Sequence, residues 1–248
     1  MIEKIILASA NPGKLAEIAE ILAPVKVVPY TELFGEFEIA ETGETFKENA
    51  RIKAETISAK TDMPVIADDS GLVIPALDGF PGVRTHEFAI ESGGYDAAFA
   101  EIEKRLGASD NSAFFVSTIA VAIKGQKTMF ATGEIHGTLR FPAAGAGGFG
   151  YDPIFVPNGR GCSMAEIDEM EPEFKSQFSH RAVALRKLAG YIAGLNAVAA
   201  PVAEEKVEEV GVEKKKAAPK TSNRAKREIK EEEFETAMEA AVETKEND

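Results

Sequence analysis

Residues 5–22 read IILASANPGKLAEIAEIL, which is an apolar run, a short polar turn and then an amphipathic segment. The apolar run predicts a strand at residues 3–8. In the third part, apolar residues recur at the i, i+3, i+4, i+7 spacing of a core-facing helix at residues 12–22; they are Leu15, Ile18, Ala19 and Leu22. A strand that leads through a tight turn into a helix is typical of α/β domains.

The polar turn contains more than a helix start requires. Asn11 is a favoured N-cap residue, and Pro12 suits the first helical position, where a missing N–H costs nothing. Gly13 permits close approach to the backbone, and Lys14 places a cation against the helix dipole. A plain helix cap and a cap that also binds phosphate both stay open, although the turn lacks the residues of a Walker P-loop.

The composition of the chain limits the classes of protein to which it can belong. It has 248 residues, 44% of them hydrophobic, and its single cysteine, Cys162, excludes an internal disulfide. No apolar stretch approaches the length of a membrane span, and the N-terminus lacks a signal-peptide pattern. We therefore expect a cytoplasmic protein with no membrane partner. The net charge of -13 argues against broad nucleic-acid affinity of the core.

Further helical and extended patterns follow along the chain. We expect helices at residues 44–60, 95–106 and 180–195, and strands at residues 64–67, 113–123, 127–134 and 153–156. Gly125 lies between the second and third of these strands, as in a hairpin. Helices that alternate with strands, together with one hairpin, predict an α/β domain with a mixed sheet.

The composition changes near residue 197, so we expect one domain at residues 1–196 and a charged extension at residues 197–248. Residues 197–221 have the composition of a disordered linker, and residues 228–244 carry a rough apolar stripe that predicts a helix. Residues 214–227 contain Lys and Arg without an acidic residue. A solvated tail stays open, as does a segment that docks an unknown partner or tethers nucleic acid.

Two adjacent carboxylates, Asp68 and Asp69, directly follow the apolar strand at residues 64–67. Neighbouring residues of a strand point to opposite sides, so one carboxylate can face a metal or water while the other anchors the loop. The alternative is a simple Asx-turn. Ser70 adds a hydroxyl, and Glu41, in the sequence AETGETF, is a further candidate metal ligand.

Lys53 lies on the apolar face of the helix expected at residues 44–60, in line with Phe46, Ala50 and Ile57. Its ammonium group either extends out to solvent or pairs with an anion such as Asp69 or a phosphate.

Two later stretches combine aromatic and charged residues. AAGAGGFGYDPIF contains Gly145, Gly147 and Gly150 in the G-x-G-x-x-G spacing, but a proline and a strand follow, which excludes a dinucleotide fold. This stretch is either a glycine hinge that presents Phe149, Tyr151 and Asp152 to a base, or a tight turn with packed aromatic residues.

In the second stretch, FKSQFSHRAVAL, Ser179 is a candidate helix cap. His180 and Arg181 follow it at the helix N-terminus, where cations oppose the dipole, and Lys175 precedes it. This placement favours a bound anion or a polar base, whereas a lone histidine would more often be structural.

The motifs SANPGK, ETGETFKENARIKA, ADDSGL, GGFGYDPIF and SHRAVAL occur in this order, and together they resemble the inosine/xanthosine triphosphate pyrophosphatase (Ham1-like) family over residues 1–196. The resemblance implies a homodimer with a two-lobed α/β fold, in which helices flank a long mixed sheet and the active-site cleft lies between the lobes. It also implies Mg2+-dependent hydrolysis of the noncanonical purine nucleotides ITP, dITP and XTP to the monophosphate and pyrophosphate.

The resemblance also implies residue roles. Asp69 is then the general base and a Mg2+ ligand, Lys53 supports catalysis and Glu41 is a second candidate ligand. The triphosphate would be held by Ser9, Ala10, Asn11, Pro12, Gly13 and Lys14, and Ser70 would contact the substrate. Base selection would fall to Phe149, Gly150, Tyr151, Asp152, Lys175, His180 and Arg181.

One stretch departs from the family pattern. PGVRTHEF places Thr85, His86 and Glu87 where the family has a serine-alanine-arginine run, which leaves an arginine contact open although Arg84 is adjacent. Two alternatives to the pyrophosphatase remain: a nucleotide-binding scaffold without catalysis, and an enzyme that hydrolyses other damaged nucleotides. The sequence does not rank ITP, dITP and XTP.

Overall fold

The structure is a computed structural model that describes residues 3–198, all within the unit Met1–Pro201. The helix expected at residues 228–244 and the linker expected at residues 197–221, apart from its first two residues, lie outside the described part. Among the described residues, no helix is long and apolar enough to cross a membrane.

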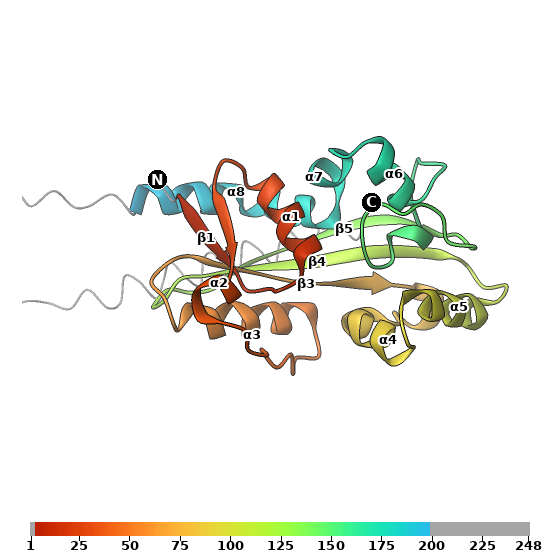
Figure 1. Ribbon diagram of the computed structural model, residues 1–248, viewed down its shortest axis with the longest axis horizontal. Helices are drawn as coiled ribbons and strands as arrows, with labels where there is room; N and C mark the ends of the chain where they lie inside the picture. Colours follow the sequence, from red (N-terminus) through yellow and green to blue (C-terminus); the bar gives the residue numbers. More distant parts are fainter. Residues whose placement is uncertain (1–2, 199–248) are drawn as a thin grey trace, which may run out of the picture. The chain divides into compact units, whose positions relative to one another are not determined.

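A mixed sheet of six strands organises the fold, with the order β2-β1-β3-β4-β5-β6 (Figure 1). Its parallel part joins β1 (Lys4–Leu7) to β2 (Lys26–Pro29) and to β3 (Val65–Val73). The antiparallel part continues from β3 through three further strands, which are β4 (Ser112–Ala122), β5 (Met129–Leu139) and β6 (Phe155–Pro157). The predicted α/β class and mixed sheet are confirmed.

Helices cover both faces of this sheet. In Figure 1, α1 (Pro12–Ile21) and α8 (His180–Val198) lie on one face, and α3 (Phe46–Ser58) lies on the other. Toward the far ends of the long strands, α4 (Thr85–Glu91) and α5 (Tyr95–Leu106) lie on the α3 side. The remaining helices are short: α2 (Thr31–Phe34), α6 (Met164–Met170) and α7 (Phe174–Phe178).

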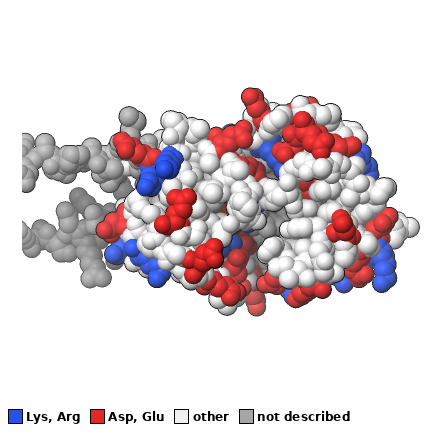
Figure 2. Space-filling model, in the orientation of Figure 1, with Lys and Arg blue, Asp and Glu red and all other residues white. Residues whose placement is uncertain are grey.

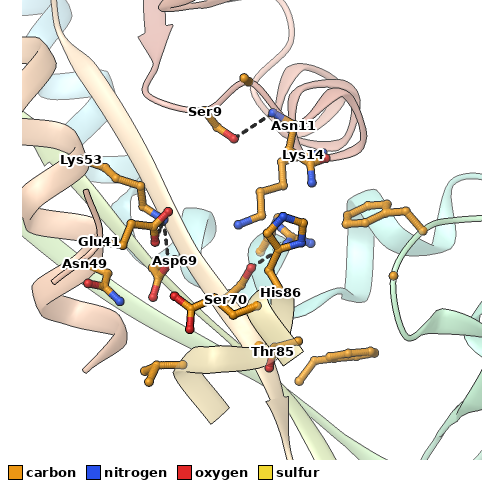
Figure 3. A pocket seen from close by; sticks show the side chains of 18 of the residues that line it. Ser9, Asn11, Lys14, Glu41, Asn49, Lys53, Asp69, Ser70, Thr85 and His86 are labelled. Atoms are coloured by element: carbon orange, nitrogen blue, oxygen red, sulfur yellow. Dashed lines mark hydrogen bonds and ion pairs between the residues drawn. The ribbon is translucent and has the colours of Figure 1, made fainter. Parts of the chain in front are cut away.

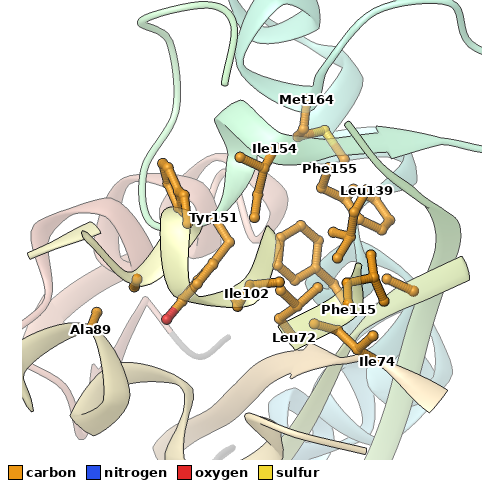
Figure 4. Packing of buried hydrophobic residues seen from close by; sticks show 14 of the residues in the cluster. Leu72, Ile74, Ala89, Ile102, Phe115, Leu139, Tyr151, Ile154, Phe155 and Met164 are labelled. Carbon is orange, nitrogen blue, oxygen red and sulfur yellow. The ribbon is translucent and has the colours of Figure 1, made fainter. Parts of the chain in front are cut away.

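The buried apolar residues form separate clusters at the two ends of the long strands. One end is filled from both faces of the sheet, by α1 and α8 against residues such as Ile66 and by α3 against residues such as Ala67. At the other end, Leu72, Phe115 and Leu139 pack with α5 and α6 (Figure 4). The two clustered ends correspond to the expected two lobes, joined by the continuous strands β3, β4 and β5.

The sequence-based assignment was wrong about where the strand at residues 64–67 ends. We expected a loop at Asp68 and Asp69, but β3 continues to Val73 and pairs with β4 along its whole length. Burial of both carboxylates inside a strand is possible because neighbouring cations and hydroxyl groups contact them. The short elements β2, α2, α4, α6 and α7 were not predicted, since they are too brief to show a periodic pattern.

Candidate active site

A cavity of about 740 Å³ lies between the two clustered ends of the sheet. It is lined by the turn between β1 and α1, by the middle of β3, by α3 and α4, and by the start of α8 (Figure 3). Acidic side chains predominate on the face drawn in Figure 2. The cavity walls contain the cations Lys14, Lys53, Lys175 and Arg181 together with carboxylates such as Glu41, Asp69 and Asp152. Each of these cations is paired with a carboxylate, so an anionic ligand would share or replace that partner.

The turn between β1 and α1 is a capped helix start, as predicted. The Asn11 side chain accepts a hydrogen bond from the Lys14 backbone N–H at 3.1 Å, and Pro12 lies in the first turn. The Ser9 hydroxyl in turn accepts the Asn11 N–H at 3.2 Å. These bonds fix the turn without any ligand.

Gly13 serves a purpose that its sequence context did not reveal. A Cβ atom there would lie 2.7 Å from the Phe149 ring, so the absence of a side chain lets that aromatic ring pack against α1. Neither Pro12 nor Gly13 lines the cavity. Both residues shape the turn, and a contact of either with a triphosphate stays a prediction, whereas the other four predicted residues of the turn line the cavity.

Asp68 is completely buried and binds several partners at once. Its Oδ2 atom lies 2.8 Å from Lys14 Nζ and 3.3 Å from Arg181 Nε, and its Oδ1 atom accepts the Ser117 hydroxyl at 2.6 Å. Burial alone would raise the pKa of Asp68, but Arg181 and Lys14 lower it well below its usual value. Asp68 is therefore ionised and linked to elements from across the fold.

Asp69 points to the other side of β3, where it forms a buried pair with Lys53. Lys53 Nζ lies 2.6 Å from Asp69 Oδ1 and 2.8 Å from Glu41 Oε2. Lys53 thus pairs with an anion rather than extending to solvent. Asn49 supports this arrangement, because its side chain accepts the Gly43 backbone N–H at 2.8 Å and so fixes the segment that follows Glu41.

The second carboxylate oxygen of Asp69, Oδ2, is buried and has no hydrogen-bond partner among the described residues. Burial raises the pKa of Asp69 to about 7, although Lys53 opposes the rise. A carboxyl group with a pKa near neutrality, one free oxygen and a place on a cavity wall has the properties of a general base.

The opposite wall of the cavity is aromatic. The Phe149 ring has Lys175 Nζ 5.1 Å and Arg181 Cζ 5.3 Å from its centroid. Asp152 Oδ2 accepts hydrogen bonds from Lys175 Nζ at 2.5 Å and from the Phe149 N–H at 2.9 Å. The Tyr151 hydroxyl donates to the Thr85 carbonyl at 3.0 Å, which ties this wall to α4.

The start of α8 supplies the remaining polar groups. Ser179 caps the helix, accepting the Ala182 N–H at 3.1 Å, as predicted. Arg181 donates to Glu17 at 3.0 Å and to the Ser70 hydroxyl at 2.8 Å, so its position is fixed from several sides.

His180 is buried and stacks on Phe115, with ring centroids 5.2 Å apart. Burial and the neighbouring Arg181 lower its pKa well below the usual value. His180 is therefore neutral, which corrects the expectation of a cation at this position. Its Nδ1 atom has no hydrogen-bond partner among the described residues, which leaves a polar atom for a ligand.

The predicted site residues thus come together from distant parts of the sequence. Besides Pro12 and Gly13, all of them line the cavity: Ser9, Ala10, Asn11, Lys14, Glu41, Lys53, Asp69, Ser70, Phe149, Gly150, Tyr151, Asp152, Lys175, His180 and Arg181. Sequence reasoning missed Glu17, Asn49 and Ser117. Glu17 is adjacent to the apolar stripe of α1, a position at which an acidic residue signals a buried partner.

The stretch that departs from the family pattern lies at the rim of this cavity. The Thr85 hydroxyl accepts the Leu72 backbone N–H at 2.9 Å and joins α4 to β3. His86 and Glu87 line the rim and are exposed. Arg84 does not line the cavity, because its side chain turns to Glu87 and Glu91 on α4. In the described part of the chain, this stretch therefore supplies no arginine to the cavity lining.

Together, the fold and the cavity define an α/β protein with a cationic turn, a buried carboxylate–lysine pair and an aromatic wall around one cavity. The model of the Ham1 family matches residues 5–191, and the chain belongs to this family.

Similar proteins agree with this assignment. A dITP/XTP pyrophosphatase of Bradyrhizobium sp. is 41% identical over 199 residues, which cover 75% of this chain and 92% of that protein. A dITP/XTP pyrophosphatase of Legionella pneumophila is 37% identical over 191 residues, which cover 75% of this chain and 96% of that protein. Among solved structures, the Staphylococcus aureus Ham1 protein has a TM-score of 0.68 at 34% identity, covering 77% of this chain and 99% of its own.

Proposed function

We propose that this protein hydrolyses noncanonical purine nucleoside triphosphates such as ITP, dITP and XTP to the nucleoside monophosphate and pyrophosphate, and so cleanses the nucleotide pool. The observation that carries the proposal is the Lys53–Asp69 pair in the cavity lining, in which the Asp69 Oδ2 atom has no hydrogen-bond partner among the described residues. The names of the curated relatives, dITP/XTP pyrophosphatases, support it.

In this proposal, Asp69 removes a proton from the water that attacks the α-phosphorus. The Lys53 ammonium group, 2.6 Å from Asp69, holds the carboxylate in place. Lys14 and the polar turn before α1 stabilise the negative charge of the leaving pyrophosphate. Lys14 is paired with Asp68 in the present structure, so the phosphate would share or replace this partner.

Two carboxylates are available for a divalent cation, although the described residues contain no group of three or more His, Cys, Asp or Glu side chains that could hold one. Asp69 has a carboxylate oxygen without a partner among the described residues, and Glu41 places a second carboxylate beside the same lysine. Mg2+ is commonly held by one or two carboxylates together with substrate phosphates. We propose that Asp69 and Glu41 hold Mg2+, which when bound would offset negative charge on the triphosphate.

Base selection would take place at the aromatic wall. Phe149 offers a ring for stacking, and Lys175 and Arg181 offer N–H donors near it. N–H donors directed at the 6-position of the purine can bond to the keto oxygen of hypoxanthine or xanthine, which is an acceptor. Adenine has an amino group at this position, which is itself a donor and cannot accept these bonds. This mismatch is the proposed reason for rejection of ATP.

We further propose, from the family resemblance, a cytoplasmic homodimer whose catalytic domain is residues 1–196. The mass of the purified protein in solution, measured by light scattering, tests the dimer. A mass near 26.6 kDa, that of one chain, would contradict it.

The Asp69→Asn variant tests the proposed reaction. The amide keeps the size of the side chain but cannot accept the proton, so turnover of ITP with Mg2+ should fall by about 100-fold or more. Asp62→Asn is the matched control, because Asp62 is exposed and lies outside the cavity. Wild-type turnover in Asp69→Asn would remove Asp69 from its role, and tight ITP binding without hydrolysis by the wild type would favour a nucleotide-binding scaffold.

A further inference from the structure

The glycine-rich loop (residues 143–150) carries Phe149, and a glutamate outside the loop, Glu169, binds the middle of this loop. Glu169 lies on α6, outside the cavity lining. Its Oε1 atom accepts the backbone N–H groups of Ala146 at 2.5 Å and of Gly147 at 2.9 Å. One carboxylate oxygen thus holds two consecutive amides in the middle of the loop.

The loop is packed closely against α6 at the same place. A Cβ atom on Gly147 would lie 2.6 Å from the Ala165 carbonyl oxygen and 3.1 Å from Glu169 Cγ. A Cβ atom on Gly145 would lie 2.6 Å from the Glu166 backbone nitrogen. The glycines therefore allow the loop backbone to approach α6 closely enough for the Glu169 carboxylate to reach both amides.

Glu169 differs from the other anchors of this loop in its surroundings. At the start of the loop, Ala144 bonds to the Pro153 carbonyl and the buried Ser163 hydroxyl, within the fold. At its end, Asp152 accepts the Phe149 N–H and also binds Lys175, inside the proposed base site. Glu169 is exposed and lies outside the cavity lining that contains the proposed substrate groups.

We propose that Glu169 is a positioning residue for substrate binding, which holds the glycine-rich loop so that the Phe149 ring stays over the base end of the cavity. This inference rests on the proposed function for its kinetic consequence. Phe149 contacts Gly13 of α1 and lies beside Lys175 and Arg181, so a displaced loop would also disturb the wall that these residues form.

The expected consequence is a change in binding and not in chemistry, because Glu169 lies outside the cavity lining that contains Lys53 and Asp69 and bonds to the loop amides instead. We expect Glu169→Ala to raise the KM for ITP about 10-fold, which corresponds to about 1.4 kcal/mol, while kcat stays within about 2-fold. Glu169→Gln should be intermediate, because its amide oxygen still accepts N–H bonds but carries no charge.

The matched control is Glu171→Ala. Glu171 is an exposed glutamate two positions further on, and its carboxylate pairs with Arg160 instead of the loop. Its KM and kcat should equal those of the wild type. A KM in Glu169→Ala equal to that of the wild type would contradict the proposal, as would a fall in kcat at constant KM.

Hydrogen–deuterium exchange without nucleotide separates this proposal from the proposed function. Loss of the carboxylate should speed exchange in the peptide that contains Ala146 and Gly147 in Glu169→Ala, but not in Glu171→Ala. Unchanged exchange would overturn the anchor whether or not the protein hydrolyses ITP. If the wild type hydrolyses no ITP, faster exchange still supports the anchor, and the proposed function is the statement that fails.

Discussion

Asp68 and Asp69 are chemically identical neighbours with opposite properties. They point to opposite sides of β3, and each meets a different set of partners. Both carboxylate oxygens of Asp68 are bonded and its pKa is lowered, whereas Asp69 has one oxygen without a partner in the described part of the chain and a pKa raised to about 7. Asp68 is therefore suited to holding parts of the fold together, and Asp69 is suited to proton transfer.

The raised pKa of Asp69 predicts a pH dependence. The base must be deprotonated to accept a proton, so kcat/KM for ITP should rise about 10-fold per unit as the pH increases toward 7, and level off above it. Bound Mg2+ would move this break to lower pH, because a cation favours the carboxylate. Initial rates in overlapping buffers at fixed Mg2+ give the profile.

Circular dichroism at each pH is the control that the fold persists. A kcat/KM that falls as the pH increases through this range would contradict Asp69 as the base, because it would require a group that acts while protonated.

At the scale of elements, Asp68 joins parts of the fold that are distant in sequence. It contacts Lys14 on α1, Ser117 on β4 and Arg181 on α8. Arg181 continues the connection to Glu17 on α1. The cationic turn and the start of α8, which both line the cavity, are therefore held by one buried carboxylate.

Replacement of Asp68 by alanine should destabilise the protein. Among the described residues, the change leaves Lys14 without an anionic partner and Arg181 with Glu17 alone. A broken buried pair typically costs about 3–5 kcal/mol in the free energy of unfolding. Urea unfolding followed by circular dichroism measures this cost, with the exposed Asp62→Ala as the control. An unfolding free energy within about 0.5 kcal/mol of the wild type would contradict the structural role of Asp68.

Ionised Asp68 stabilises the folded protein, so this stabilisation should decrease at low pH. Because the native pKa of Asp68 is lowered, the stabilisation is fully present above the unfolded-state pKa of about 3.9. It is lost as the pH falls through the native pKa.

At the scale of the molecule, elements with a long periodic pattern were predictable from the sequence, and contacts between residues far apart in sequence were not. The apolar stripe of α1 and the hairpin of β4 and β5 follow from local spacing, and the structure confirms them. The continuation of β3 through two aspartates depends on Lys14, Lys53 and Arg181, which lie far away in sequence. Local patterns carry no information about such partners.

The candidate site shows the same division. The predicted residues that line the cavity were found because their motifs occur together in order, while Glu17 and Glu169 were missed because they act through tertiary contacts that no local pattern shows. Gly13 was noticed as a position that allows close approach, but its neighbour, the Phe149 ring, became apparent only from the fold.

The central claim is that this cavity hydrolyses noncanonical purine triphosphates, and the rate of pyrophosphate release tests it most directly. Purified full-length protein with Mg2+ should release pyrophosphate from ITP or XTP at least about 100-fold faster, in kcat/KM, than from ATP, because the cavity donors oppose the adenine amino group. Equal kcat/KM values for ITP and ATP, or release of inorganic phosphate in place of pyrophosphate, would contradict the account.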